Sequence, residues 1–270
     1  MTAIRVLSLG AGVQSSTLLY MMCDGTLPKA DHAIFADTGW EPANVYEHLE
    51  YLKPLMQNAG ITFHQVSAGN IRHDMISGGR FATMPFHLQN DDGSKGIIRR
   101  QCTGEYKINP LLKKQRQLAG LMPGQRSKEH LMTTVIGISY DESQRMRDPA
   151  FSWLKNEYPL VDQKLTRQDC IDYASKNGYR IPPRSACIGC PFKSNDEWRR
   201  LRDENPTEWH DAVDFDHSMR RPGTKVVELL RGTAYLHQSL KPLDQADLRT
   251  DKEKGIYSLF DQECEGMCGL

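Results

Sequence analysis

The stretch that decides the fold runs from Ile4 to Cys23 and reads Ile-Arg-Val-Leu-Ser-Leu-Gly-Ala-Gly-Val-Gln-Ser-Ser-Thr-Leu-Leu-Tyr-Met-Met-Cys. Its first part, Ile4–Leu9, is apolar and β-branched and ends in glycine, which predicts a strand followed by a tight turn. From Ser15 onward the leucines and methionines recur at helical spacing, so a helix is expected as far as Cys23. The chain therefore opens as strand, glycine turn and helix.

The same alternation continues along the chain. Strands are expected at 32–36, 61–66 and 133–138, and a helix at 43–58. Parallel neighbours need long crossovers, and a helix is the usual crossover. We therefore expect an α/β fold with a doubly wound, mostly parallel sheet.

The regular pattern stops between Ser67 and Gln101, where glycine and polar clusters predict a long mobile loop beside the sheet edge. Beyond Tyr158 helix starts are indicated by Thr166 with Asp169, by Ser194 with Glu197 and by Pro206. This predicts two units: an α/β domain at 1–160, and a helical, cysteine-bearing region with a mobile C-terminal tail at 161–270.

Composition restricts the class of protein. The chain has 270 residues, 39% of them hydrophobic, and no apolar run reaches the ~18 residues of a membrane helix. No signal peptide can be recognised at the N-terminus, so a cytoplasmic protein that does not enter the membrane is expected. Because 34 basic residues balance 34 acidic ones, the net charge gives no support to a nucleic-acid partner.

The glycine turn is a candidate phosphate-binding loop, spanning residues 8–17. Small residues let the backbone approach an anion, and the exposed amides and positive end of the helix favour phosphate there. Hydroxyls of Ser15, Ser16 or Thr17 could add donors. Many α/β proteins use such a turn without binding phosphate, so the loop alone does not identify a ligand.

Four stretches together resemble a known family. Gly10-Ala11-Gly12-Val13-Gln14-Ser15 resembles the Ser-Gly-Gly-x-Asp-Ser pattern of the PP-loop, and 37–42 resembles an Asp-Thr-Gly segment. Residues 137–145 are similar to a Gly-x-Arg-x-x-Glu-Ser motif, with Ser139 where arginine is common, and 158–173 is similar to a substrate-side helix. The chain therefore resembles the PP-loop adenine nucleotide alpha-hydrolase superfamily, and within it the phosphoadenosine phosphosulfate (PAPS) reductase-like family.

The resemblance implies an adenine nucleotide ligand, either ATP or a sulfonucleotide (PAPS or APS), with Mg²⁺ as a further candidate. Gln14 stands where enzymes that split ATP keep an aspartate, which favours the reductase branch. Asp37 could hold a ribose hydroxyl or a metal, or could simply cap a turn. The expected nucleotide-binding residues are Ser8, Gly10, Ala11, Gly12, Gln14, Ser15, Ser16, Asp37, Thr38, Gly137, Glu142 and Arg145.

The paired cysteines Cys187 and Cys190 have a spacing that lets both thiolates face one metal or cluster. Reductases with an iron-sulfur cluster have cysteines at similar places, which adds Cys102 as a ligand. Cys264, Cys268 or a histidine could be the fourth, or three cysteines could hold a cluster with one open iron. The resemblance favours a 4Fe-4S cluster. Zinc is the alternative, as a structural ion needing a fourth thiolate or imidazole. Cys23 and Cys170 lie in apolar helical patterns and are expected in the core.

The C-terminal tail ends in Cys268-Gly269-Leu270, which resembles the reductases' ending, whose mobile cysteine attacks the sulfonate sulfur. Cys268 and Cys264 are therefore the candidate catalytic residues, with a thiol reductant such as thioredoxin as partner. The tail cysteines could instead complete the metal site or belong to a frayed end.

Three functions remain open from the sequence. The first is thiol-dependent sulfonucleotide reduction or sulfur transfer. The second is an ATP-dependent, iron-sulfur-dependent sulfurtransferase that adenylates a nucleic-acid or small-molecule acceptor and releases pyrophosphate. The third is a non-catalytic nucleotide-binding accessory protein.

Overall fold

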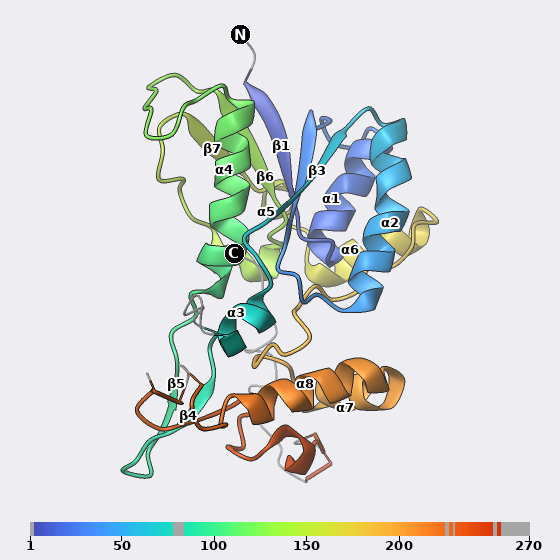
Figure 1. Cartoon of the computed structure of the whole chain (residues 1–270). Coiled ribbons are helices and arrows are strands. Elements are labelled where there is room, and N and C mark those ends of the chain that lie inside the picture. The colour runs from blue at the N-terminus through green and yellow to red at the C-terminus, as the bar shows by residue number, and fades with distance from the viewer. Residues whose placement is uncertain (1–2, 78–83, 225–226, 229, 251–252, 255–270) are drawn as a thin grey trace.

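The centre of the molecule is a five-stranded parallel sheet (Figure 1). The computed structural model describes residues 3–77, 84–224, 227–228, 230–250 and 253–254. The strands are β1 (Ile4–Leu9), β2 (His32–Asp37), β3 (Thr62–Ser67), β6 (Met132–Ile136) and β7 (Leu154–Glu157). Their order is β3-β2-β1-β6-β7, so β1 lies in the middle. The predicted α/β fold class is confirmed, although the sequence did not reveal β7.

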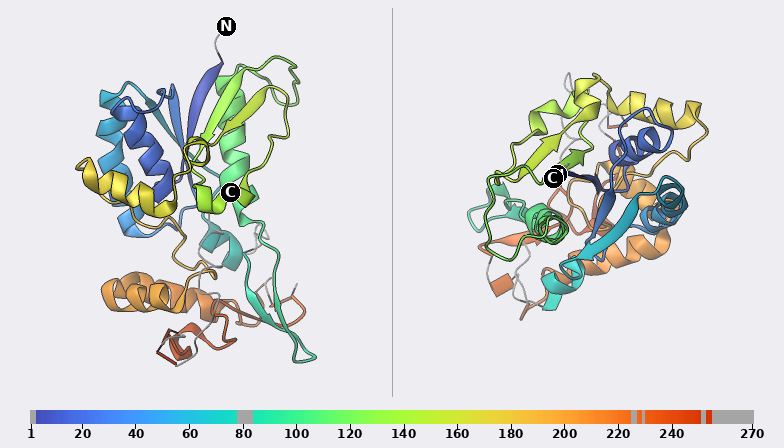
Figure 2. Two further views of the ribbon diagram at one scale, coloured as in Figure 1. Left: turned by 180° about the vertical axis from the view of Figure 1, so that it is seen from behind. Right: turned by 90° about the horizontal axis from the view of Figure 1, so that it is seen from above.

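Helices cover both faces of this sheet because side chains alternate along each strand. Leu7 and Leu9 face one core cluster, shared with α1 (Val13–Cys23), α2 (Ala43–Asn58) and α6 (Arg167–Lys176). Val6 faces the opposite cluster, where α4 (Asn109–Leu118) packs. Figures 1 and 2 show α1 and α2 on one side of the sheet and α4 on the other.

A smaller layer lies beyond the carboxyl ends of the strands, at the bottom of Figure 1. It contains α3 (Ile71–Ser77), α7 (Asn195–Glu204), α8 (Pro206–Ser218) and a three-stranded antiparallel sheet. In that sheet β4 (His87–Gln89) pairs with β5 (Lys95–Ile97) and with β8 (Thr233–Tyr235). The region expected to be one long loop therefore contributes a helix and a hairpin to this layer.

The predicted helix starts of the second half are confirmed. Thr166 and Asp169 form a reciprocal capping box at α6, and Ser194 and Glu197 form another at α7. Each box satisfies two backbone N–H groups that the first helical turn leaves without acceptors. Pro206 occupies the first turn of α8, where its missing N–H costs nothing.

The apolar core of the smaller layer joins two distant parts of the chain. It combines residues near 71–106 with residues from 188 to 248, and Trp198 and Phe215 are fully buried in it. Helix α6, by contrast, packs on α1 in the first core. The division of domains at residue 160 stays a prediction.

The described residues also form a π-helix at Thr103–Ile108, the short helix α5 (Pro159–Asp162), and 3-10 turns at Tyr140–Arg145 and Leu243–Gln245. Across the described ranges, no helix has the length and apolar character needed to cross a bilayer.

Candidate functional site

The phosphate loop, residues 8–17, turns sharply between β1 and α1. Ala11 has a φ of 54°, a left-handed conformation that is uncommon for a residue with a side chain. Gly12 caps α1 with extended backbone and no side-chain cap, and the Ser15 hydroxyl accepts from the Gly10 N–H at 3.1 Å. The first amides of α1 have no acceptor within the helix. This geometry can present N–H groups and a positive helix end to an anion.

Gly137, directly after β6, fits against the phosphate loop. A Cβ at this position would lie 2.7 Å from the backbone nitrogen of Ser15 and 2.9 Å from its Cα. Only glycine allows β6 and the start of α1 to approach so closely. Gly137 therefore shapes the loop by lacking a side chain.

Ser16 and Thr17 point into the protein interior. Both are fully buried, the Ser16 hydroxyl lies 3.0 Å from Nε2 of His48, and the Thr17 hydroxyl donates to the carbonyls of Val13 and Cys170. Burial lowers the pKa of His48 to about 4, so its ring is neutral at physiological pH. Ser16 was predicted to bind the nucleotide, but its hydroxyl already has an internal partner in His48. The Ser15 hydroxyl instead bonds within the phosphate loop.

Gln14 joins the phosphate loop to the segment after β6. Its side-chain amide donates to the Glu142 carboxylate at 3.2 Å and lies 3.5 Å from the Ser139 hydroxyl. Arg145 donates to the same Glu142 oxygen at 2.5 Å. Burial raises the pKa of Glu142, with Arg145 opposing the shift. Gln14 and Ser139, two of the positions that depart from the PP-loop patterns, therefore meet in one polar cluster.

Asp37 has several internal partners at the end of β2. Its carboxylate accepts from the Gly39 N–H at 2.8 Å, from the Tyr46 hydroxyl at 2.9 Å and from the Gln65 amide at 2.9 Å. These contacts fit the turn-capping alternative, and a nucleotide contact for Asp37 stays a prediction. Thr38 is buried, and its hydroxyl donates to Glu41 and lies 3.4 Å from the sulfur of Cys187.

The structure brings three of the four predicted cysteine ligands together, and the fourth, Cys264, lies outside the described residues. Cys102, Cys187 and Cys190 line one pocket, the cysteine pocket, which lies between the main sheet and the smaller layer. Cys102 lies at the start of the π-helix, and the Cys190 N–H donates to the Cys187 carbonyl at 3.1 Å in a tight turn. The same pocket is also lined by Thr38, Arg100, Thr103, Lys107 and Ser185. Residues 102 and 187 thus converge despite their separation in sequence.

A buried carboxylate lies beside this pocket. The side chain of Glu41 has no exposed surface, Lys107 Nζ lies 3.3 Å from its Oε1, and the Cys187 thiol donates to the same oxygen at 3.8 Å. Burial, together with the negative charge of Glu41, raises the pKa of Cys187 to about 12. The Cys187 thiol is therefore protonated at neutral pH.

The described part of the chain has no preformed site for a single metal ion. No group of three or more His, Cys, Asp or Glu side chains there is arranged to hold a single metal ion. Two buried polar atoms at the pocket, Oε2 of Glu41 and Oγ1 of Thr103, have no hydrogen-bond partner in the described structure. A bound water or ion is one way in which such buried polar atoms are satisfied.

The phosphate loop and the cysteine pocket are in direct contact. A Cβ on Gly12 would lie 3.1 Å from Cβ of Ser185, which itself lines the cysteine pocket. Thr38, at the end of β2, touches Cys187. Ligands of open parallel sheets bind at this edge, so a nucleotide here would lie beside the cysteines.

A wider cleft is lined by Pro182, Pro183 and Arg184, the residues directly before Ser185. It begins at Val13 in the first turn of α1 and extends along α7. Four basic side chains line it, Arg167, Arg184, Lys193 and Arg200, and four acidic ones, Asp196, Glu197, Glu204 and Glu208. Arg184 pairs with Glu197 and Arg200 with Asp196, so much of this charge is neutralised within the protein.

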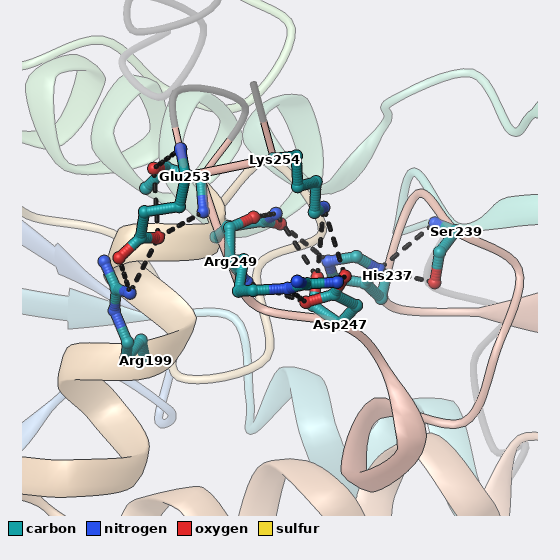
Figure 3. A network of polar contacts seen from close by, with 9 residues as sticks. Arg199, His237, Ser239, Asp247, Arg249, Glu253 and Lys254 are labelled. Carbon is teal, nitrogen blue, oxygen red and sulfur yellow. Dashed lines mark hydrogen bonds and ion pairs between the residues drawn. The ribbon is translucent and has the colours of Figure 1, made fainter. Parts of the chain in front are cut away.

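The candidate catalytic cysteines Cys264 and Cys268 lie outside the described residues. The preceding chain is held on α7 by the network in Figure 3. Glu253 accepts from Arg199 at 2.8 Å, and the amide of Asn195 donates to the Arg249 carbonyl at 2.6 Å and is paired with buried His237.

Sequence reasoning missed three residues around the cysteines: Glu41, Lys107 and Trp40. No local pattern in the sequence indicates that Lys107 and Glu41 pair, because residues 66 positions apart meet only in the folded chain. Cys23 and Cys170 were correctly placed in the first core.

Comparison with solved structures finds a similarity to phosphoadenylyl-sulfate (PAPS) reductase from Candida auris in a phosphate complex. The similarity covers 68% of this chain and 76% of that one, with 15% sequence identity and a TM-score of 0.44. No protein-family model matches the sequence. No curated protein matches it either.

Proposed function

We propose that this chain is a PAPS-reductase-like PP-loop enzyme, which binds an adenine nucleotide at residues 8–17 and performs sulfur chemistry beside it. The observation that carries the proposal is the contact of Gly12, in the phosphate loop, with Ser185, which lines the cysteine pocket. An enzyme acting on the sulfur of a nucleotide needs its thiols within reach of the bound phosphates.

In this proposal the first amides of α1 and the Ser15 hydroxyl bind the phosphates. The polar cluster of Gln14, Glu142 and Arg145 supports the loop from behind. Gln14 brings no charge to this end of the helix, unlike the aspartate of the PP-loop pattern. That difference favours a sulfonucleotide whose phosphates stay intact.

The proposed reaction starts when the thiolate of Cys268, or of Cys264, attacks the sulfonate sulfur. A sulfur–sulfur bond forms, the sulfur–oxygen bond breaks, and the adenosine phosphate leaves with the electron pair. A thiol donor such as thioredoxin then attacks the cysteine sulfur, which releases sulfite and forms a disulfide. Two thiols are oxidised and the sulfonate is reduced, so electrons balance.

The second candidate function is ATP-dependent sulfur transfer, which the convergence of Cys102, Cys187 and Cys190 favours. Here an acceptor oxygen is adenylated with release of pyrophosphate, and sulfide then displaces AMP. A 4Fe-4S cluster would supply an open position that binds sulfide.

In this second candidate the cysteine pocket would hold the cluster. Three thiols and two orphaned polar atoms gather there without forming a compact ligand set for one ion. Thiolates around a multi-iron cluster lie further apart than those around one ion, and Lys107 and Arg100 would offset negative charge. Cys102, Cys187 and Cys190 would be the ligands.

Product analysis separates the candidates. Protein purified without oxygen is incubated with PAPS or APS and reduced thioredoxin, and separately with ATP, sulfide and either RNA, DNA or no acceptor. Sulfite release that Cys268→Ser abolishes supports reduction, whereas pyrophosphate release that Cys187→Ser abolishes supports sulfur transfer. If neither product appears although the nucleotide binds, the accessory-protein alternative holds and both enzymatic proposals are wrong.

A further inference from the structure

Trp40 lies in the loop after β2, between Thr38 and Glu41, and only 4% of it is exposed. Thr38 touches the sulfur of Cys187 from one side of this loop. The loop also reaches the turn that carries the paired cysteines.

The indole ring of Trp40 lies directly on that turn. A Cβ on Gly189, between Cys187 and Cys190, would be 2.1 Å from Cη2 of Trp40 and 2.6 Å from Cζ3. No side chain fits there while the ring keeps its place. In addition, the Ile188 N–H donates to the Trp40 carbonyl at 3.0 Å. Ring and backbone together fix the turn.

Trp40 is itself held from the far side by α8. Its indole N–H donates to Asp211 at 2.6 Å, and its ring meets that of Phe215 edge-on with centroids 4.6 Å apart. Asp211 also forms an ion pair with Arg72 of α3, with 2.8 Å between Nε of Arg72 and Oδ1 of Asp211. The ring therefore has little freedom to rotate away from Gly189.

We propose that Trp40 is the positioning residue of the Cys187–Cys190 turn, holding both thiols at the edge where the nucleotide loop ends. The role assigned to the cysteines rests on the proposed function, but their placement by Trp40 does not. Gly189 is the complementary feature, because its missing side chain lets the indole cover the turn.

Thiol labelling tests this directly. Alkylation by iodoacetamide, followed by mass spectrometry of each cysteine peptide, measures how well Cys187 is shielded, since only the exposed thiolate reacts. Metal-free protein without nucleotide is used, so the result does not depend on activity. Cys23 is the internal reference, because it is half-buried on α1 and packs against the first core, whereas Trp40 belongs to the core of the smaller layer.

We expect Trp40→Ala to speed Cys187 alkylation about tenfold or more while the Cys23 rate is unchanged. Trp40→Phe, which keeps a ring but loses the bond to Asp211, should give an intermediate rate and provides a folded variant if alanine does not fold. Trp209→Phe, which alters another buried tryptophan of the same core, should change neither rate.

Equal Cys187 rates in wild type and the Trp40→Phe and Trp40→Ala proteins would overturn the proposal. A parallel rise at Cys23 would overturn it as well, because it would mean general loosening. Failure of the product assays described above would contradict the proposed function and leave the labelling result intact, so the two failures can be distinguished.

Discussion

The side-chain amide of Gln14 donates a hydrogen bond to the carboxylate of Glu142 at 3.2 Å, which connects the first turn of α1 to the segment after β6. Because Arg145 pairs with the same carboxylate, Glu142 has a cation on one side and a neutral donor on the other. A neutral residue at position 14 therefore suits both Glu142 and a phosphate bound at this helix end.

Replacing Gln14 by Glu should weaken nucleotide binding about tenfold, as measured by titration calorimetry. The variant places a second carboxylate next to Glu142 and next to the bound phosphates, and like charges in a partly buried site repel strongly. Gln14→Met, which removes the amide without adding charge, is the control and should bind within about threefold of wild type. Equal weakening in both variants would argue against the charge explanation.

Gly137→Ala should disturb the phosphate loop. Its new methyl group would lie 2.7 Å from the nitrogen of Ser15, so the loop must move, and such overpacking costs about 1–3 kcal/mol. Urea unfolding should show this loss together with weaker nucleotide binding. Gly104→Ala is the matched control, because a Cβ there meets no atom within 4 Å. If both variants unfold like wild type, the close approach at Gly137 is wrong.

Lys107→Met should destabilise the protein by about 3 kcal/mol, since it leaves the fully buried Glu41 carboxylate without its cation. The double variant Lys107→Met with Glu41→Gln should recover much of that loss, because no buried charge remains. Free energies of unfolding in urea give the comparison. If the double variant loses as much free energy of unfolding as the two single variants lose together, Lys107 and Glu41 do not interact directly.

Burial of His48 should make the free energy of unfolding depend on pH. Its folded pKa is lowered from 6.5 to about 4 by burial, so between these values the unfolded chain binds a proton that the native ring does not. The free energy of unfolding should therefore fall as pH drops from about 6.5 towards 4, by up to about 1.4 kcal/mol per pH unit.

His48→Gln, which can still reach Ser16, removes this titration. The stability difference between wild type and the variant should change across that pH window and stay constant above it. Parallel curves from pH 7.5 to 4.5 would show that His48 does not titrate as described.

Much of the main sheet could be predicted because its signals are local. The run Ile4–Leu9 and the helix ending at Cys23 have apolar periodicity that depends only on neighbouring residues. The same holds for the capping boxes at Thr166 and Ser194. These features need no knowledge of distant contacts.

The elements between Ser67 and Gln101 could not be predicted, for a physical reason. Strands β4 and β5 have three residues each, too short for an alternating pattern, and β4 is completed by β8 more than 140 positions later. The same limit applies to the candidate site. Motif resemblance indicated Cys102 with Cys187, but the packing of Trp40 on Gly189 depends on the folded chain.

Protection of the cysteine-pocket thiols by nucleotide tests the central claim, that the phosphate loop and the cysteine pocket form one site. The alkylation rates of Cys102, Cys187 and Cys190 are measured in metal-free protein with and without saturating PAPS or ATP, with Cys23 as reference. We expect slower labelling of at least Cys187 when the nucleotide is bound. Unchanged rates for all three cysteines, at a nucleotide concentration shown by calorimetry to be saturating, would contradict it.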